Sequence, residues 1–145
     1  MKNADKLQEL VSIARDGAKF YDEAGREVHD PSLKLLFLRM ADHKRHIINS
    51  LSGKLAANLE DVPEEGTFAG KARQMYADLR ASLSSNEEKV YVAQLEEAED
   101  RLLEHFEQAL KESDDPGVRS ILKQHAPEVR SCHAEMSALK KRLAA

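Results

Sequence analysis

The stretch Asp30-Pro31-Ser32-Leu33, with its counterpart Asp115-Pro116-Gly117-Val118 placed 85 residues later, decides how this chain folds. A residue that precedes proline is pushed out of the α-helical region of backbone conformation. Proline itself is favoured in the first turn of a helix, where its missing N–H is not needed. Each Asp-Pro pair therefore ends one helix and begins the next, so the two pairs predict two helical hairpins.

On both sides of each pair, apolar residues recur every three or four positions, which is the spacing of one face of a helix. This spacing predicts long helices over residues 4–29, 32–59, 87–113 and 117–143, and a shorter helix over 68–83. A helix of about 28 residues is about 42 Å long. The connection over residues 60–86 can reach about 45–50 Å if it combines a loop with that shorter helix. It can therefore return along the bundle and make the second and third long helices parallel.

The two hairpins also resemble each other in sequence. The 85-residue shift that aligns the Asp-Pro pairs also aligns Tyr21 with Phe106 and Ala24 with Ala109. A hairpin used twice would give this pattern, although two amphipathic hairpins also match in part by chance. Two hairpins joined by one long crossover form the plan of ferritin-like bundles. The sequence thus predicts a single all-α domain over residues 1–145, a ferritin-like four-helix bundle of two antiparallel hairpins whose long crossover contains an extra short helix.

Composition excludes several other classes of protein. Of the 145 residues, 33% are charged and 5% are aromatic, and the net charge is −4. Few aromatic residues argue against sandwiches and barrels, and a mildly acidic balance gives no electrostatic footprint for nucleic acid or a membrane surface. One cysteine, Cys132, allows no internal disulfide. With no signal-like segment and no apolar run long enough to span a membrane, we expect a cytoplasmic protein.

A few polar residues fall on the inner faces of the helices, where burial is costly unless they find partners. Glu99 and His43 both fall near the middle of the bundle, and so do His125 and Glu128. The first interpretation is a buried His43–Glu99 ion pair that fixes the register of the helices. The alternative is a divalent-metal site for Fe, Mn or Zn, in which case the candidate ligands are Glu99, His43, Glu128, His46 and His133.

A complete di-iron centre is excluded by sequence. Such centres take Glu-x-x-His from two of the four helices, whereas this chain has His43-Lys44-Arg45-His46 and Glu128-Val129-Arg130-Ser131. Pro127 removes a hydrogen bond inside the last helix, and a bulge there would aim His125 or Glu128 inward. Cys132 falls at a core position, which favours a packed thiol over a reactive one.

Several segments resemble a bacterial family of unknown function. They are the hairpin turns, Gly66-Thr67-Phe68-Ala69-Gly70, Glu96-Glu97-Ala98-Glu99-Asp100, and the stretch from Gln124 to Glu135. The resemblance covers nearly the whole chain and implies a ferritin-like four-helix bundle, with metal or oxidative-stress chemistry as its expected activity. This chain departs from the family at His43, where the family has glutamate, and at Pro127.

Two functions remain open on the sequence. One is a non-enzymatic binding, structural or stress-related protein with a His/Glu cluster in mid-bundle, and the other is a metal-binding or redox protein with an incomplete ferritin-like site. The absence of a recognisable catalytic motif favours a protein that is not an enzyme, with no firmly assigned cofactor. Four apolar residues outside the main stripe are expected at the surface, where they would cover the crossover or form a homodimer contact, namely Phe20, Leu35, Leu38 and Ile48.

Overall fold

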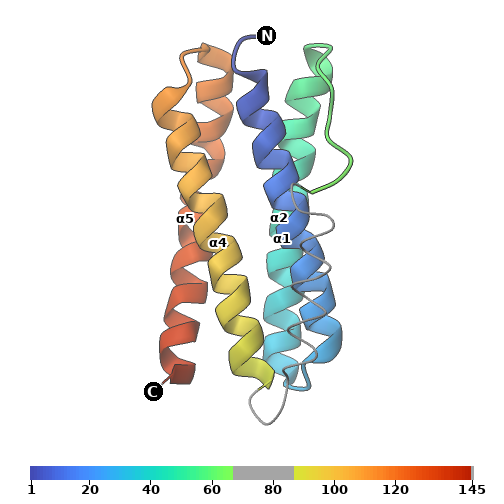
Figure 1. Cartoon of the computed structure of the whole chain (residues 1–145), viewed down its shortest axis with the longest axis vertical. Helices are drawn as coiled ribbons and strands as arrows, with labels where there is room; N and C mark the ends of the chain where they lie inside the picture. The colour runs from blue at the N-terminus through green and yellow to red at the C-terminus, as the bar shows by residue number, and fades with distance from the viewer. Residues whose placement is uncertain (67–86, 145) are drawn as a thin grey trace.

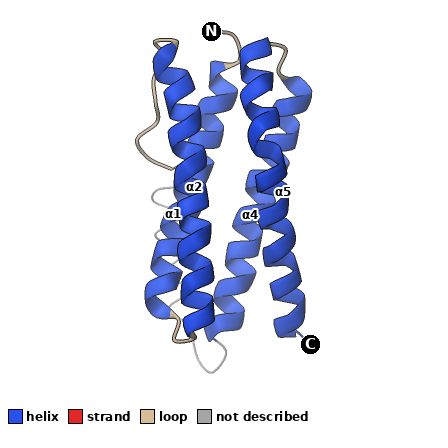
Figure 2. Cartoon of the chain, turned by 180° about the vertical axis from the view of Figure 1, so that it is seen from behind, coloured by secondary structure: helices blue, strands red, loops and turns tan. Residues whose placement is uncertain are grey.

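Four long helices pack into a bundle in this protein (Figure 1). The computed structural model describes residues 1–66 and 87–144, and these contain helices and loops but no strand (Figure 2). The helices are α1 (Ala4–Glu27), α2 (Pro31–Ala57), α4 (Glu87–Glu112) and α5 (Pro116–Ala144). The predicted all-α four-helix bundle is therefore confirmed. The helix expected over residues 68–83 lies outside the described residues.

The helices are paired as two antiparallel hairpins, α1 with α2 and α4 with α5, and α1 also packs on α4 (Figure 1). Contacts at one end of the bundle fix the direction of α4. The Met1 amino group is 3.0 Å from Glu60, which follows α2, and Lys6 Nζ is 2.9 Å from Glu112 at the end of α4. Helices α2 and α4 therefore run in the same direction, as the length of their connection predicted. The backbones of α2 and α5 come close together at fewer positions than those of the three pairs above.

Both Asp-Pro pairs act as helix caps. Asp30 Oδ1 accepts hydrogen bonds from the backbone N–H groups of Ser32, at 2.7 Å, and Leu33, at 3.2 Å. Asp115 Oδ2 accepts one from the N–H of Val118 at 3.0 Å. The first N–H groups of a helix have no partner within it, so these carboxylates stabilise the beginnings of α2 and α5. The sequence prediction of both turns is confirmed.

The core consists of two apolar clusters with a polar layer between them. One cluster is built from the first part of α1 and α5 and the last part of α2 and α4, and includes Leu7, Leu10, Leu51, Leu55, Phe106 and Leu122. The other occupies the opposite end and includes Tyr21, Phe37, Met40, Tyr91, Met136 and Leu139. Lys44 on α2 and Glu99 on α4 fall between the two clusters, and both are buried. The polar layer therefore crosses the middle of the bundle.

The apolar residues outside the main stripe divide into two groups. Leu35 and Leu38 are exposed, at 69% and 51%, whereas Ile48 is only 6% exposed and belongs to the first apolar cluster. The prediction of a surface position is therefore wrong for Ile48, because the inner face of α2 is wider than one stripe. None of the described helices is long and apolar enough to cross a membrane.

Gly17 offers a test of packing around the polar layer. A Cβ atom added at Gly17 would lie 3.6 Å from Cγ of Lys44, an ordinary van der Waals distance. Because glycine is unfavourable inside a helix, we expect Gly17→Ala to stabilise the protein by about 0.5–1 kcal/mol. Gly17→Leu should destabilise it, since the longer side chain collides with the stem of Lys44. Urea denaturation of the three proteins would measure both effects, and a less stable alanine variant would contradict the packing described.

Candidate functional site

A buried ion pair joins α2 to α4 at the centre of the bundle. Lys44 Nζ lies 2.6 Å from Glu99 Oε1, and the two side chains are 2% and 0% exposed. Tyr21 on α1 donates a hydrogen bond of 2.7 Å to the same oxygen. Burial, and then the negative charge of Glu99, raise the pKa of Tyr21 well above its ordinary value, so its hydroxyl stays protonated and remains a donor. Three helices are therefore connected through one carboxylate.

The partner of Glu99 differs from the one expected. Glu99 is buried as predicted, but Lys44 occupies the place beside it that the sequence interpretation gave to His43. A signal for Lys44 was present, because it follows Met40 by four positions and precedes Ile47 by three on the buried face of α2. Lysine is rarely fully buried, so the sequence interpretation gave Lys44 no role in the buried centre. Gly17 leaves the space that the lysine stem fills.

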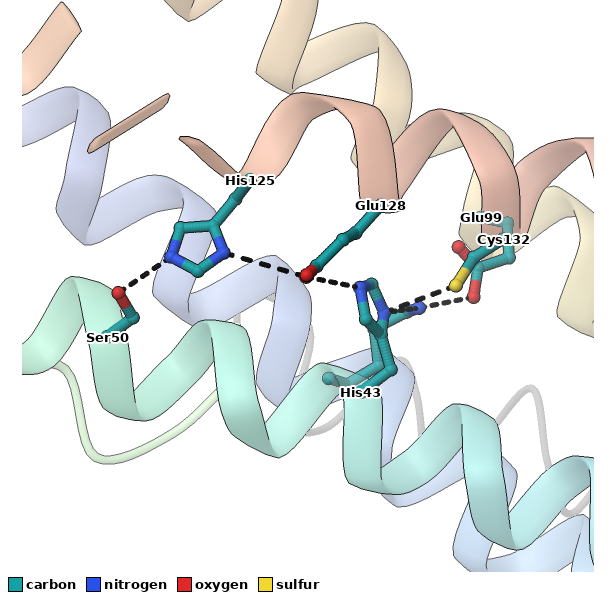
Figure 3. A network of polar contacts seen from close by, with 7 residues as sticks. His43, Ser50, Glu99, His125, Glu128 and Cys132 are labelled. Carbon is teal, nitrogen blue, oxygen red and sulfur yellow. Dashed lines mark hydrogen bonds and ion pairs between the residues drawn. The ribbon is translucent and has the colours of Figure 1, made fainter. Parts of the chain in front are cut away.

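His43 lies between this ion pair and the boundary of α2 with α5. Its Nδ1 atom is 3.0 Å from Lys44 Nζ and 3.4 Å from Cys132 Sγ, and its Nε2 atom faces Glu128 Oε2 at 3.5 Å. Burial, followed by the charge of Lys44, lowers the pKa of His43 to about 4. The imidazole is therefore neutral near pH 7. Figure 3 shows that it connects the buried centre to Glu128.

Cys132 is a packed thiol, as its core position suggested. It belongs to the second apolar cluster and is 9% exposed. Burial raises the pKa of the thiol to about 11, so very little of the reactive thiolate is present at neutral pH.

A second group of polar side chains faces the boundary between α2 and α5 (Figure 3). His125, 2% exposed, has its Nε2 atom 2.7 Å from the hydroxyl of Ser50 and its Nδ1 atom 3.7 Å from Glu128 Oε2. The rings of His46 and His125 meet edge to face, with centroids 5.4 Å apart. One ligand atom from each of His46, His125 and Glu128 lies within 4.8 Å of the others. Among residues 1–66 and 87–144, these three side chains form the group that could hold a metal ion.

The five ligands expected from the sequence are thus divided among separate places. Glu128 and His46 belong to the group above, and His43 contacts Glu128 from the side of the buried centre. Glu99 is occupied by Lys44, while His133 lies 3.2 Å from Asp100 on α4. His125 and Ser50 were missing from the expected set. His125 had been recognised as an inward-facing residue, and its position three residues before Glu128 on one helix face was the signal that could have added it.

An all-α four-helix bundle with buried polar side chains across its middle is the class of protein defined by these observations. Residues 2–112 match the family described as Domain of unknown function DUF2383. This match covers more than half of the chain, so the chain belongs to that family. The matched region includes Lys44 and Glu99 but ends before His125 and Glu128. Searches of curated proteins and of solved structures found no match.

The buried ion pair predicts a large effect of removing one partner. Glu99→Gln leaves the Lys44 ammonium buried without its anion and aims an amide donor at the place of Glu99 Oε2, which has no hydrogen-bond partner among the described residues. We expect a loss of about 3–5 kcal/mol in the free energy of unfolding, with the helical fold retained. Urea denaturation followed by circular dichroism would measure the loss.

The matched control is the double variant Lys44→Met with Glu99→Leu, which removes both charges and keeps the volume. We expect it to be more stable than Glu99→Gln, because no charge is left buried and unpaired. A double variant as unstable as the single one would contradict the assignment of the cost to the unpaired ammonium.

His43 predicts a dependence of stability on pH. Its pKa is about 4 in the folded chain and 6.5 in the unfolded chain, so the unfolded state binds more protons between these values. The neutral ring therefore favours the folded state fully above pH 6.5, and this stabilisation is lost as the pH falls towards 4, at a cost of at most about 3 kcal/mol because partial exposure screens the neighbouring charges. Between pH 7 and 4, with a chelator present, the wild type should lose more stability than His43→Gln. Equal losses in the two proteins would show that His43 is not buried in its neutral form.

Proposed function

We propose that this protein binds a divalent transition-metal ion between α2 and α5 through His46, His125 and Glu128. The observation that supports the proposal is that one ligand atom from each of these three residues lies within 4.8 Å of the others. They come from α2 and α5, one helix of each hairpin, so an ion there would add a link between the two hairpins. The role is binding, and it needs no catalytic group.

The donor set favours particular ions. Two imidazoles and one carboxylate form the ligand set of several zinc sites and of mononuclear iron(II) sites. Magnesium and calcium prefer oxygen ligands and would bind poorly. Among the ions suggested by the sequence, zinc and iron(II) therefore suit the site best, and manganese is a weaker candidate.

The spacing of the donors supports a single ion. Donor atoms about 2.0–2.1 Å from a tetrahedral zinc ion lie about 3.4 Å from one another. His125 Nδ1 and Glu128 Oε2 are 3.7 Å apart, so they need little movement to bind one ion. His46 and Glu128 are exposed side chains. A rotation of these side chains can bring their donor atoms to the separation that one ion requires.

The state of His125 also suits a ligand. Burial lowers the pKa of His125, so the ring is neutral near pH 7 and needs no deprotonation of an imidazolium before binding. When Nδ1 binds an ion, Nε2 carries the ring proton and can donate it to the oxygen of Ser50 2.7 Å away. A hydroxyl both donates and accepts hydrogen bonds, so Ser50 can hold the ring before and after binding.

The buried ion pair and the proposed ligands are different residues. Lys44 and Glu99 account for the fixing of register that the sequence suggested for a polar centre. His46, His125 and Glu128 contribute no comparable buried pair, since His46 and Glu128 are both exposed. A metal-binding role explains why three ligand-type side chains converge there, and it is therefore preferred to a purely structural role.

Zinc affinity tests the proposal. We expect the chelator-treated wild type to bind about one Zn²⁺ per chain in competition with a chromophoric chelator. His46→Ala and Glu128→Gln should each weaken binding at least tenfold, since each removes a ligand from an exposed position. Saturating Zn²⁺ should also raise the melting temperature, because a ligand that binds only the folded state stabilises it.

His133→Ala is the matched control. His133 contacts Asp100 on α4 and is not part of the three-residue group, so its removal should leave the zinc affinity unchanged. Mg²⁺ should neither compete nor shift the melting temperature. The proposal is refuted if the wild type binds no zinc, or if the His46 and Glu128 variants bind zinc as the wild type does.

A further inference from the structure

One side chain connects the buried ion pair to the proposed metal ligands. His43 receives Lys44 Nζ on its Nδ1 atom at 3.0 Å and presents its Nε2 atom to Glu128 Oε2 at 3.5 Å. Glu128 Oε2 is also the oxygen that faces His125 Nδ1 at 3.7 Å. A series of polar contacts therefore runs from Glu99 through Lys44 and His43 to Glu128, the carboxylate of the proposed metal site (Figure 3).

The chemistry of these side chains determines which atom donates and which accepts at each contact. An ammonium group donates hydrogen bonds and cannot accept them, so Lys44 requires an unprotonated Nδ1 on His43. The single proton of the neutral imidazole must then be on Nε2, and it points at Glu128. Lys44 has little freedom to turn away, because Glu99 holds it at 2.6 Å and it is 2% exposed. The core of the bundle therefore determines which nitrogen of His43 is the donor.

The carboxylate at the end of the chain needs such a donor. The side chain of Glu128 is 50% exposed, so without a partner it would sample several orientations. A hydrogen bond from a neighbouring group to a ligating carboxylate fixes its orientation, and loss of such a bond typically weakens metal binding 10–100-fold.

We propose that Lys44 and Glu99 act through His43 as positioning residues for Glu128, so that the buried ion pair sets the affinity of the metal site. This inference rests on the proposed function. His43 does not bind the ion in this arrangement. Its Nε2–H faces the ligand oxygen at 3.5 Å, close enough to form a hydrogen bond after a small movement of the exposed carboxylate, and Lys44 keeps the proton on that nitrogen.

Substitutions at two points of this series of contacts test the proposal. His43→Leu removes the donor, and Lys44→Met with Glu99→Leu removes the group that orients it without leaving a buried charge. We expect both proteins to bind Zn²⁺ 10–100-fold more weakly than the wild type, although every ligand is retained. The protein with all three substitutions should bind Zn²⁺ no more weakly than His43→Leu alone, because all three remove the same hydrogen-bond donor to Glu128.

Two further variants separate positioning from a general loss of structure. His43→Gln keeps an acceptor for Lys44 and a donor for Glu128, and it should restore most of the zinc affinity. Cys132→Ala removes the other neighbour of His43 Nδ1, at 3.4 Å, and should leave the affinity unchanged. The visible absorption of bound Co²⁺ reports ligand geometry, and it should change in His43→Leu and return in His43→Gln.

The outcomes distinguish this inference from the function on which it rests. Wild type that binds no zinc would overturn both. Wild type that binds zinc, with unchanged affinity in His43→Leu and in the Lys44 and Glu99 double variant, would overturn the inference alone. If His43→Leu fails to fold, the double variant and His43→Gln decide the question, because neither leaves a charged group buried without a partner.

Discussion

An ammonium and a carboxylate lie 2.6 Å apart in the middle of this bundle, both almost completely removed from water. Placing two charges there costs several kcal/mol per ion, and only a close contact with further hydrogen bonds offsets it. Tyr21 supplies one of those bonds, and Gly17 leaves room for the lysine stem. Any sliding of α2 along α4 would separate the charges. The apolar clusters above and below the pair contain most of the buried side chains, and nonpolar contacts of that kind depend less on direction than the contact between the two charges.

The same pair determines what surrounds it. Lys44 takes the position beside Glu99, which leaves His43 one residue earlier on the helix and directs it towards α5. The backbones of α2 and α5 approach each other closely at few positions, and long polar side chains reach across this boundary. Ser50, His125 and Glu128 lie along this boundary (Figure 3). His43 thus links the buried ion pair at the centre of the bundle to the proposed metal ligands at the boundary of α2 and α5.

The fold could be predicted from the sequence because its signals are local. Asp30-Pro31 and Asp115-Pro116 mark both turns, and the apolar spacing marks every described helix. The inward direction of Glu99 also followed from spacing. The identity of its partner did not, because Lys44 and His43 differ by only one helical position, and the choice between them depends on the space beside Gly17 on another helix. Likewise, the convergence of His46 with His125 depends on how α2 faces α5, which no single helix encodes. The relation to ferritin-like proteins stays a prediction.

The 85-residue shift between the hairpins has a geometric meaning at the centre. It relates position 43 to position 128, and position 16 to position 101. Both pairs are in contact, His43 with Glu128 at 3.5 Å and Asp16 with Arg101 at 3.8 Å. Equivalent positions on two antiparallel helices meet where an approximate two-fold axis would pass between those helices. In a symmetric dimer of one hairpin, each of these side chains would face its own copy, and paired aspartates, arginines or glutamates would repel each other. A single chain escapes that restriction, so histidine can face glutamate and aspartate can face arginine across the axis.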